Sequence, residues 1–180
     1  PERPFIAIVA GAKEDKIGAL KALANKADKI LIAGVLANTF LKAKGIGIGA
    51  SKFDEEIFSA AEEIIDLAGD KLKLPVDCVV ADKFDNNATT RTVAADNIPE
   101  GWMALDIGPE TIESYKNELK DAKTVFWAGP LGVFEMENFS HGTREIGEFL
   151  GNLNAVKIAG GGDTGAAINT FNLADKMTHV

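Results

Sequence analysis

Three consecutive glycines, followed by an acid and a hydroxyl, stand between an apolar run and a helix-like run in "IAGGGDTGAA", residues 158–167. A turn needs one or two glycines, so the triplet Gly160, Gly161 and Gly162 indicates that a ligand comes close to the main chain. Backbone N–H groups at a helix start attract anions, and the helix dipole adds to this attraction. Thr164 can donate a hydroxyl to a phosphate, and Asp163 can hold the Mg²⁺ that accompanies a nucleotide. The structural alternative makes Asp163 a helix cap.

Two lysines follow a bare turn in "AGAKEDKIG", residues 10–18. Gly11 and Ala12 keep this turn free of large side chains, and Lys13 and Lys16 come where a helix is expected to begin. A lysine at a helix start opposes the dipole, so two of them need a compensating anion, which phosphate groups would supply. The alternative is that these lysines are simply solvated, as most surface lysines are.

A third junction, "WAGPLGVFEMENF" over residues 127–139, predicts a stiff loop of low profile. Gly129, Pro130 and Gly132 would let this loop lie flat against a planar base. Glu135 could then accept hydrogen bonds from two sugar hydroxyls. An acid is also favoured at a helix start without any ligand, so this motif alone does not decide the function.

These junctions follow short apolar runs that recur along the chain with little polar alternation. Such runs are typical of strands that are buried on both faces of a parallel sheet. Five of the six runs end in glycine and the third ends in Asp82, and we expect these ends to meet at the sheet edge where ligands bind. The predicted strands cover residues 5–11, 29–34, 75–82, 102–108, 124–129 and 155–161.

Between the strands, apolar residues repeat at helical spacing. The fold class is therefore predicted to be α/β, with an open six-stranded parallel sheet and helices on both faces in a Rossmann-like three-layer α/β/α arrangement. The polar stretch 83–101 breaks this rhythm and is predicted to be a long excursion or a small hairpin. No linker divides residues 1–180, which we expect to form a single domain. The predicted helices cover residues 17–24, 57–68, 109–122, 145–153 and 164–171.

Composition excludes several function classes. The chain has 180 residues, of which 46% are hydrophobic and 26% charged, so it can bury a core and is not expected to be disordered. Its net charge of −8 disfavours nucleic acid as a partner. The single cysteine, Cys78, lies in the apolar run "VDCVVA" and is expected to be an inert buried thiol. No run approaches the roughly 18 apolar residues of a membrane span, and no signal peptide is evident, so we expect a soluble, cytoplasmic protein.

Two other interpretations compete with a nucleotide-binding enzyme. Gly160, Gly162 and Gly165 match G-x-G-x-x-G, which would indicate a dinucleotide-dependent oxidoreductase. That fingerprint requires an acid about 20 residues further on, after a following strand, and the sequence does not provide one. A stand-alone, non-catalytic nucleotide-binding module is the second alternative. A Walker A loop is absent, because the sequence contains no Gly-Lys dipeptide.

Taken together, the junctions resemble the C-terminal, nucleotide-binding lobe of the phosphoglycerate kinases. The resemblance runs along the whole chain through "GAKEDKIG", "ANTFLKAKG", "LPVDCVVADKF", "IPEGWMALDIGPETI", "WAGPLGVFEMENFSHGT" and "AGGGDTGAA". It implies reversible phosphoryl transfer in glycolysis, in which 1,3-bisphosphoglycerate and Mg-ADP give 3-phosphoglycerate and ATP. Phosphoryl transfer depends on positioning and charge stabilisation, which bare backbone, lysines and magnesium provide.

The resemblance also implies individual roles. Lys13 and Lys16 would contact the nucleotide phosphates, and Glu135 would take the ribose hydroxyls. Asp163 would bind Mg²⁺. The adenine would be bordered by Gly34, Leu105 and Pro130, and the phosphates would be surrounded by Gly161, Gly162 and Thr164.

The resemblance finally implies a monomeric, two-lobed kinase of which this chain is one lobe. The N-terminal lobe, which holds the phosphoglycerate, and the family's C-terminal tail have no counterpart in the sequence. We therefore expect this chain to bind Mg-nucleotide without catalysing transfer by itself.

Overall fold

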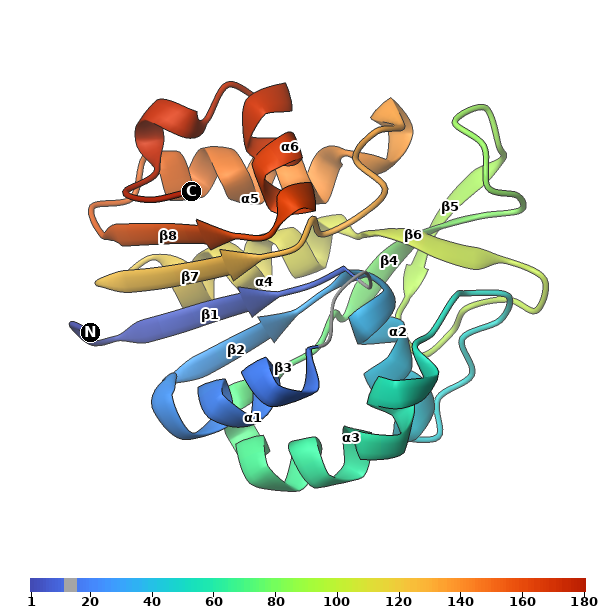
Figure 1. Cartoon of the computed structure of the whole chain (residues 1–180). Coiled ribbons are helices and arrows are strands. Elements are labelled where there is room, and N and C mark those ends of the chain that lie inside the picture. Colours follow the sequence, from blue (N-terminus) through green and yellow to red (C-terminus); the bar gives the residue numbers. More distant parts are fainter. Residues whose placement is uncertain (12–15) are drawn as a thin grey trace.

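The computed structural model describes residues 1–11 and 16–180, which contain β-strands, α-helices and short 3₁₀ helices (Figure 1). The strands are β1 (Phe5–Val9), β2 (Lys29–Ile32), β3 (Leu72–Lys73), β4 (Asp77–Ala81), β5 (Thr90–Ala94), β6 (Met103–Ile107), β7 (Thr124–Ala128) and β8 (Val156–Gly160). The α-helices are α1 (Ile17–Lys26), α2 (Gly34–Ala43), α3 (Glu55–Ala68), α4 (Pro109–Leu119), α5 (His141–Gly151) and α6 (Gly162–Thr170). Three short 3₁₀ helices are η1 (Gly69–Lys71), η2 (Glu137–Phe139) and η3 (Ala174–Lys176).

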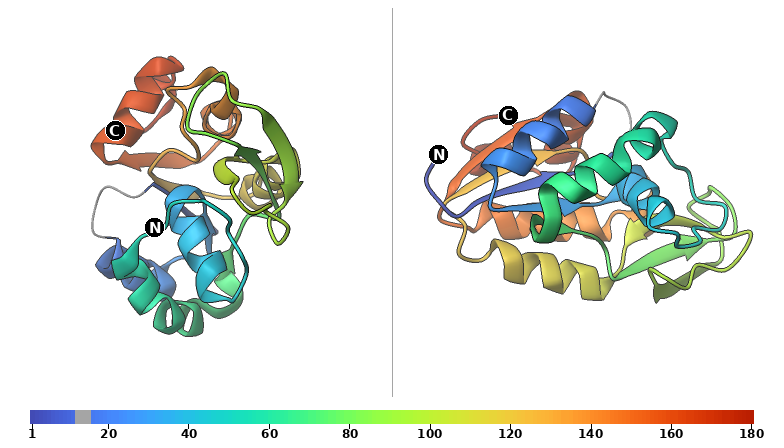
Figure 2. Two further views of the ribbon diagram at one scale, coloured as in Figure 1. Left: turned by 90° about the vertical axis from the view of Figure 1, so that its right-hand side faces the viewer. Right: turned by 90° about the horizontal axis from the view of Figure 1, so that it is seen from below.

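The main sheet has five strands in the order β3-β2-β1-β7-β8, and all of its strand pairs are parallel. β1 lies in the middle, and all five of its residues are buried. Its sequence, "FIAIV", lacks polar alternation because both of its faces are covered. Helices α1, α2 and α3 cover one face, and α4, α5 and α6 cover the other (Figures 1 and 2).

Two hydrophobic cores form on the two faces of this sheet. Phe5, Ala7 and Val9 of β1 pack with α1, α2 and α3, whereas Ile6 and Ile8 pack with α4, α5 and α6. This division follows from the alternation of side chains along a strand. The predicted α/β class and the three-layer arrangement are thus confirmed.

The prediction of one six-stranded parallel sheet is corrected. The expected third and fourth strands, β4 and β6, belong to a separate three-stranded sheet in the order β5-β4-β6, in which both pairs are antiparallel. The connection from β4 to β5 is too short for a crossover helix, so the returning strand pairs antiparallel. The stretch 83–101 therefore contains one arm of a hairpin, as one of its two interpretations predicted. In chain order, the third strand of the main sheet is the two-residue strand β3, which lies at its edge beside β2.

Of the six α-helices in residues 1–11 and 16–180, five were predicted and α2 was not. Consecutive residues of α2, from Leu36 to Leu41, are buried, so its sequence lacks the amphipathic period of a surface helix. The other helices show the expected signals, such as Pro109 at the start of α4 and the four buried apolar residues of α3. Within the part of the chain that the structure describes, no helix has the length and apolar composition needed to cross a bilayer.

Two of the outer strands, β8 and β6, carry hydrogen bonds on their outer edges. The N–H of Ala159, in β8, donates to the His179 carbonyl at 2.9 Å, so the outer edge of β8 is already hydrogen-bonded. On β6, the Leu105 carbonyl accepts from the Val133 N–H at 2.9 Å, and the Ala104 N–H donates to Ser51 Oγ at 2.8 Å. β3 has only two residues, and β5 is largely exposed.

Candidate functional site

The carboxyl ends of four parallel strands meet at one edge of the main sheet, as expected. β1, β2 and β7 are followed by Gly11, Gly34 and Gly129, which lie very close together. A Cβ added to Gly34 would lie 3.0 Å from the Gly11 nitrogen, and one added to Gly129 would lie 1.9 Å from the Ala10 carbonyl oxygen. Both glycines also have positive φ angles, of 69° and 98° respectively, so the crossing of these chain segments requires glycine.

The expectation that all six strand ends meet at this edge is wrong for two of them. Asp82 and Gly108 follow β4 and β6, which lie in the antiparallel sheet and run in opposite directions. Neither residue lines the cavities described below. Asp82 instead accepts a hydrogen bond from the Thr89 N–H within the hairpin, at 3.0 Å.

A cavity of about 190 Å³ opens at the meeting point of β1, β7 and β8, and we call it the glycine-lined cavity. Every residue that lines it, apart from Ala10, is one that the sequence predicts to bind the nucleotide. The lining residues are Ala10, Gly11, Lys16, Gly129, Pro130, Gly160, Gly161, Gly162, Asp163 and Thr164. The structure thus brings together motifs that lie about 150 residues apart in the sequence.

The three glycines at the start of α6 differ in whether the fold requires glycine. Gly161 is the N-cap of α6 and has a φ of 96°, which a residue with a side chain rarely adopts. A Cβ on Gly160 would make ordinary contact with the Phe126 ring, at 3.4 Å. A Cβ on Gly162 would meet no atom within 4 Å, and its φ is not positive. The fold therefore does not require glycine at position 162, and a close-approaching ligand would.

Asp163 and Thr164 lie in the first turn of α6, where their roles differ. The alternative in which Asp163 caps the helix is wrong, because the N-cap is Gly161 and Asp163 is the second helical residue. Asp163 lines the glycine-lined cavity. Thr164 is buried, and its Oγ1 accepts a hydrogen bond from the Gly129 N–H at 2.7 Å. Thr164 therefore fixes the loop after β7 against α6, while its hydroxyl hydrogen provides a further donor.

One of the two predicted lysines can be placed. Lys16 directly precedes α1, is largely buried, and lines the glycine-lined cavity. A lysine and the start of α6 therefore line the same cavity. The predicted contacts of Ala12 and Lys13 lie outside the described residues.

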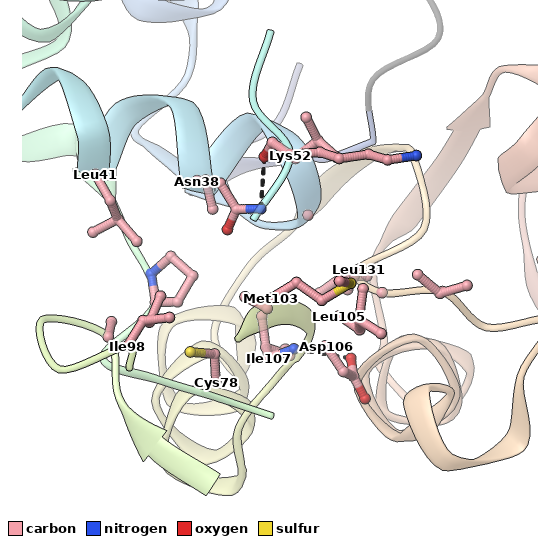
Figure 3. A pocket seen from close by; sticks show the side chains of 18 of the residues that line it. Asn38, Leu41, Lys52, Cys78, Ile98, Met103, Leu105, Asp106, Ile107 and Leu131 are labelled. Carbon is pink, nitrogen blue, oxygen red and sulfur yellow. Dashed lines mark hydrogen bonds between the residues drawn. The ribbon is translucent and has the colours of Figure 1, made fainter. Parts of the chain in front are cut away.

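A second cavity, of about 560 Å³, adjoins the first, and we call it the apolar cavity. Gly11 and Pro130 line both cavities. One face of α2 forms one wall, β6 forms the opposite wall, and the loop 130–133 closes one end (Figure 3). The three residues that the resemblance assigns to the adenine, Gly34, Leu105 and Pro130, all line this cavity.

Glu135 is not brought to either cavity. It lies in a turn, is exposed, and lines neither of them. Its role toward a ribose stays a prediction.

A buried carboxyl group that the sequence analysis did not single out lies beside the apolar cavity. Asp106, in β6, is 5% exposed, and burial holds the pKa of its carboxyl well above the usual range. Its oxygens accept from the N–H groups of Ile107, at 2.9 Å, and Gly142, at 3.1 Å. A Cβ on Gly132 would lie 2.5 Å from Asp106 Oδ1, so this carboxyl also packs against the loop 130–133. The signal in the sequence was an acid inside the apolar run "ALDIG".

Cys78 and Asn38 also line the apolar cavity. The expectation that Cys78 is buried is confirmed, and burial raises the pKa of its thiol to about 12. Asn38, on α2, is also buried, and its side-chain amide donates to the Lys52 carbonyl at 3.0 Å.

The residues at the glycine-lined cavity fit a magnesium ion that arrives with phosphate groups. Mg²⁺ is commonly held by one or two carboxylates together with substrate phosphates and water. Asp163 provides one carboxylate at this cavity. Among residues 1–11 and 16–180, no three Asp, Glu, His or Cys side chains gather in a cage that could hold a metal without such a ligand.

The fold and the site define an α/β protein whose ligand crevice lies outside the carboxyl ends of a parallel sheet, with a glycine-lined helix start for an anion and an adjoining apolar cavity. The comparisons identify the family: the chain belongs to the phosphoglycerate kinases. A family model described as "Phosphoglycerate kinase" matches residues 1–180.

Similar proteins match the chain over its whole length. The phosphoglycerate kinase of Limosilactobacillus reuteri is 58% identical and that of Latilactobacillus sakei 57% identical, and the chain covers 45% of each. A phosphoglycerate kinase structure from Coxiella burnetii has a TM-score of 0.95 at 40% identity, covering 100% of this chain and 47% of that one. A structure from Pyrococcus horikoshii has a TM-score of 0.84 at 30% identity, covering 99% of this chain and 46% of that one. The chain therefore spans less than half the length of these relatives.

Proposed function

We propose that residues 1–180 form the Mg-nucleotide-binding lobe of a phosphoglycerate kinase, which binds ADP and ATP. The observation that carries this proposal is the pair of adjoining cavities. One is glycine-lined and has a lysine and an acid at a helix start, and the other is apolar and has room for a base. Because Gly11 and Pro130 line both, one ligand with an anionic end and an apolar end can occupy the two together.

The chain's own residues would bind and orient the phosphates. The first residues of α6 line the glycine-lined cavity, and their N–H groups would donate hydrogen bonds to phosphate oxygens, aided by the helix dipole. The Lys16 ammonium group would balance part of the phosphate charge. Asp163 would hold Mg²⁺, and the ion would neutralise charge that develops on the transferred phosphoryl group.

The apolar cavity would bind the base by exclusion of water. Gly34 and Leu105 would lie against the two faces or edges of the purine, and Pro130 would keep the connecting loop rigid. In the whole enzyme, the bound ADP would accept a phosphoryl group from 1,3-bisphosphoglycerate, giving 3-phosphoglycerate and ATP. The phosphoglycerate would be held by the part of the enzyme that the 45% coverage leaves out.

A matched pair of alanine variants on α6 tests the nucleotide site. Gly162→Ala adds a methyl group where nothing in the protein occupies the space, so its fold should be unchanged. If phosphate oxygens approach the backbone there, the Kd for Mg-ADP should rise at least about tenfold, a loss of about 1.4 kcal/mol. Isothermal titration calorimetry measures this change.

Gly165→Ala is the control. Gly165 lies in the same helix, has equal space for a Cβ, and does not line the glycine-lined cavity. This variant should keep the wild-type Kd and gain up to about 1 kcal/mol in stability, because alanine favours the helix. Equal affinities for Gly162→Ala and Gly165→Ala would contradict the proposed phosphate position.

A further inference from the structure

The apolar cavity is longer than a purine base needs. Residues of one face of α2, from Gly34 to Leu41, line it over about 10 Å, given the 1.5 Å rise per residue of an α-helix. Its volume of about 560 Å³ lies within the range of roughly 300–1,000 Å³ of pockets that enclose drug-sized ligands. A base placed between Gly34, Leu105 and Pro130 would occupy only the end next to the glycine-lined cavity.

The far end of the apolar cavity, which we call the distal compartment, is built from apolar groups, of which all but the half-buried Ile98 are buried. In Figure 3, Leu41, Ile98 and Cys78 lie toward one side of the cavity and Leu105 and Leu131 toward the other. Leu41 shares a hydrophobic cluster with Ala95, and the Ala95 N–H donates to the Val76 carbonyl at 2.9 Å, which places Ala95 beside β4. The lining of the distal compartment is Leu41, Pro75, Cys78, Ala95 and Ile98.

The chemistry of the distal compartment selects an apolar occupant. Leu41, Pro75 and Ala95 are buried and have no polar side-chain atoms, and the protonated Cys78 thiol is a weak hydrogen-bonding group. Asn38 is the last amide side chain before this end, and one of its two N–H groups donates to the Lys52 carbonyl. A polar substituent would lose its hydration here without a strong partner, whereas an alkyl or aryl group would gain from leaving water.

The direction of the cavity decides which part of a nucleotide would reach this end. The phosphates are attached through the ribose to the five-membered ring of the purine. With the phosphates at the start of α6, the edge of the six-membered ring, which carries the 6-amino group, must point away from the glycine-lined cavity. That edge therefore faces the distal compartment.

We propose that the distal compartment binds an apolar group attached to the 6-amino nitrogen of the purine, so that the site accepts 6-alkylamino- and 6-arylaminopurine nucleotides. This inference rests on the proposed nucleotide site. Mg-ADP carrying a benzyl group on that nitrogen should bind the 180-residue chain about tenfold more tightly than Mg-ADP, because several carbon atoms leave water. A methyl group should give a smaller gain, and a 2-hydroxyethyl group should give none.

Isothermal titration calorimetry with these four nucleotides tests the inference on the unaltered chain. If Mg-ADP binds and the benzyl derivative binds equally or more weakly, the proposed occupant of the distal compartment is wrong. The proposed nucleotide site is not affected by that result. Absence of binding by all four would overturn both proposals.

A pair of neighbouring substitutions locates the substituent. Ala95→Leu fills the distal compartment, so the benzyl derivative should lose its advantage while the Kd for Mg-ADP stays within about threefold of the wild type. Ala94→Leu is the control, because Ala94 is exposed and lies outside the cavity. If Ala95→Leu weakens the binding of Mg-ADP and of its benzyl derivative by the same factor, the benzyl group does not occupy the distal compartment, and the proposal is wrong. Circular dichroism confirms that both variants are folded.

Discussion

At the scale of single residues, burial decides the chemistry of the titratable groups beside the apolar cavity. Cys78 and Asp106 lie on the neighbouring strands β4 and β6 and are both buried. Taking a charge out of water is costly, so burial raises the pKa of both groups. Each therefore favours its neutral form, and this preference can be measured.

Cys78 should be nearly unreactive in the folded chain. With its pKa at about 12, the thiolate fraction at pH 8 is about a thousandfold lower than for an ordinary cysteine, and access is blocked as well. We expect native protein to react with a polar aromatic disulfide at least that much more slowly than protein unfolded in guanidinium. Because the chain has one cysteine, the absorbance of the released thiol reports this site alone. Equal native and unfolded rates would contradict the burial of Cys78.

Asp106 should make stability depend on pH. Because its folded-state pKa is raised above 3.8, the folded state keeps a proton that the unfolded state has released. Its contribution to stability is thus full below 3.8 and is lost as the pH rises through the folded-state pKa. The free energy of unfolding of the wild type, relative to Asp106→Asn, should fall between pH 4 and pH 8 in urea titrations. Asp175→Asn, at an exposed position, controls for the loss of one negative charge, and a rising difference would contradict the prediction.

At the scale of secondary-structure elements, a residue of the small sheet forms hydrogen bonds with the start of α4, a helix that covers the main sheet. Asp77, in β4, accepts hydrogen bonds from the N–H groups of Glu110, at 3.0 Å, and Thr111, at 2.8 Å, at the start of α4. Thr111 Oγ1 also donates to this carboxylate at 2.6 Å. A Cβ on Gly108 would lie 2.2 Å from the Asp77 carboxyl carbon, so glycine is needed there. This contact joins the small sheet to a helix that covers the main sheet.

Removal of this contact should cost more than removal of an ordinary helix cap. Asp77→Ala should lower the free energy of unfolding by about 3 kcal/mol, because it leaves buried N–H groups without an acceptor. Asp54→Ala, which removes the local cap of α3, is the comparison and should cost about 1 kcal/mol. Urea denaturation of both variants measures the difference. Similar losses would show that Asp77 acts as no more than a local cap.

The elements also show what the sequence can and cannot predict. The strand β1 and the helix α3 have clear apolar patterns, and both were placed correctly. The pairing of β4 and β6 could not be predicted, because an apolar run indicates a buried strand without naming its neighbours. α2 was missed because it is buried almost all round, and β3 because two residues carry no period.

At the scale of the whole molecule, the site is assembled from junctions that the fold brings to one edge. The glycines after β1, β2, β7 and β8 could be predicted, since each stands at the end of an apolar run. The size of the apolar cavity could not be predicted, because it depends on how the small sheet lies against α2. The role of Asp106 could not be predicted for the same reason, because the sequence "ALDIG" does not show which loop the Asp106 carboxyl group contacts.

The whole chain should bind nucleotide without transferring phosphate. Mg-ADP at about 100 times its Kd should stabilise the folded chain by about 2.7 kcal/mol. A coupled assay with 3-phosphoglycerate and Mg-ATP should show no ADP formation, because phosphoryl transfer needs both substrates held in line. Thermal denaturation with and without Mg-ADP, beside that assay, checks both expectations. Turnover by the chain alone would contradict the division of roles proposed here.

The state of the sheet edges affects how readily copies of this chain associate at high protein concentration. In the part of the chain that is described, the outer strand β8 is bonded to residues near 179, β6 to a loop, and β3 is only two residues long. β5 is more open, but it carries Arg91, whose guanidinium stacks over Trp102. A strand from another molecule would have to displace existing hydrogen bonds at β8 or β6, or desolvate the charge of Arg91 at β5, before it could pair with the sheet. Fibrillar self-assembly by strand addition is thereby disfavoured at these edges.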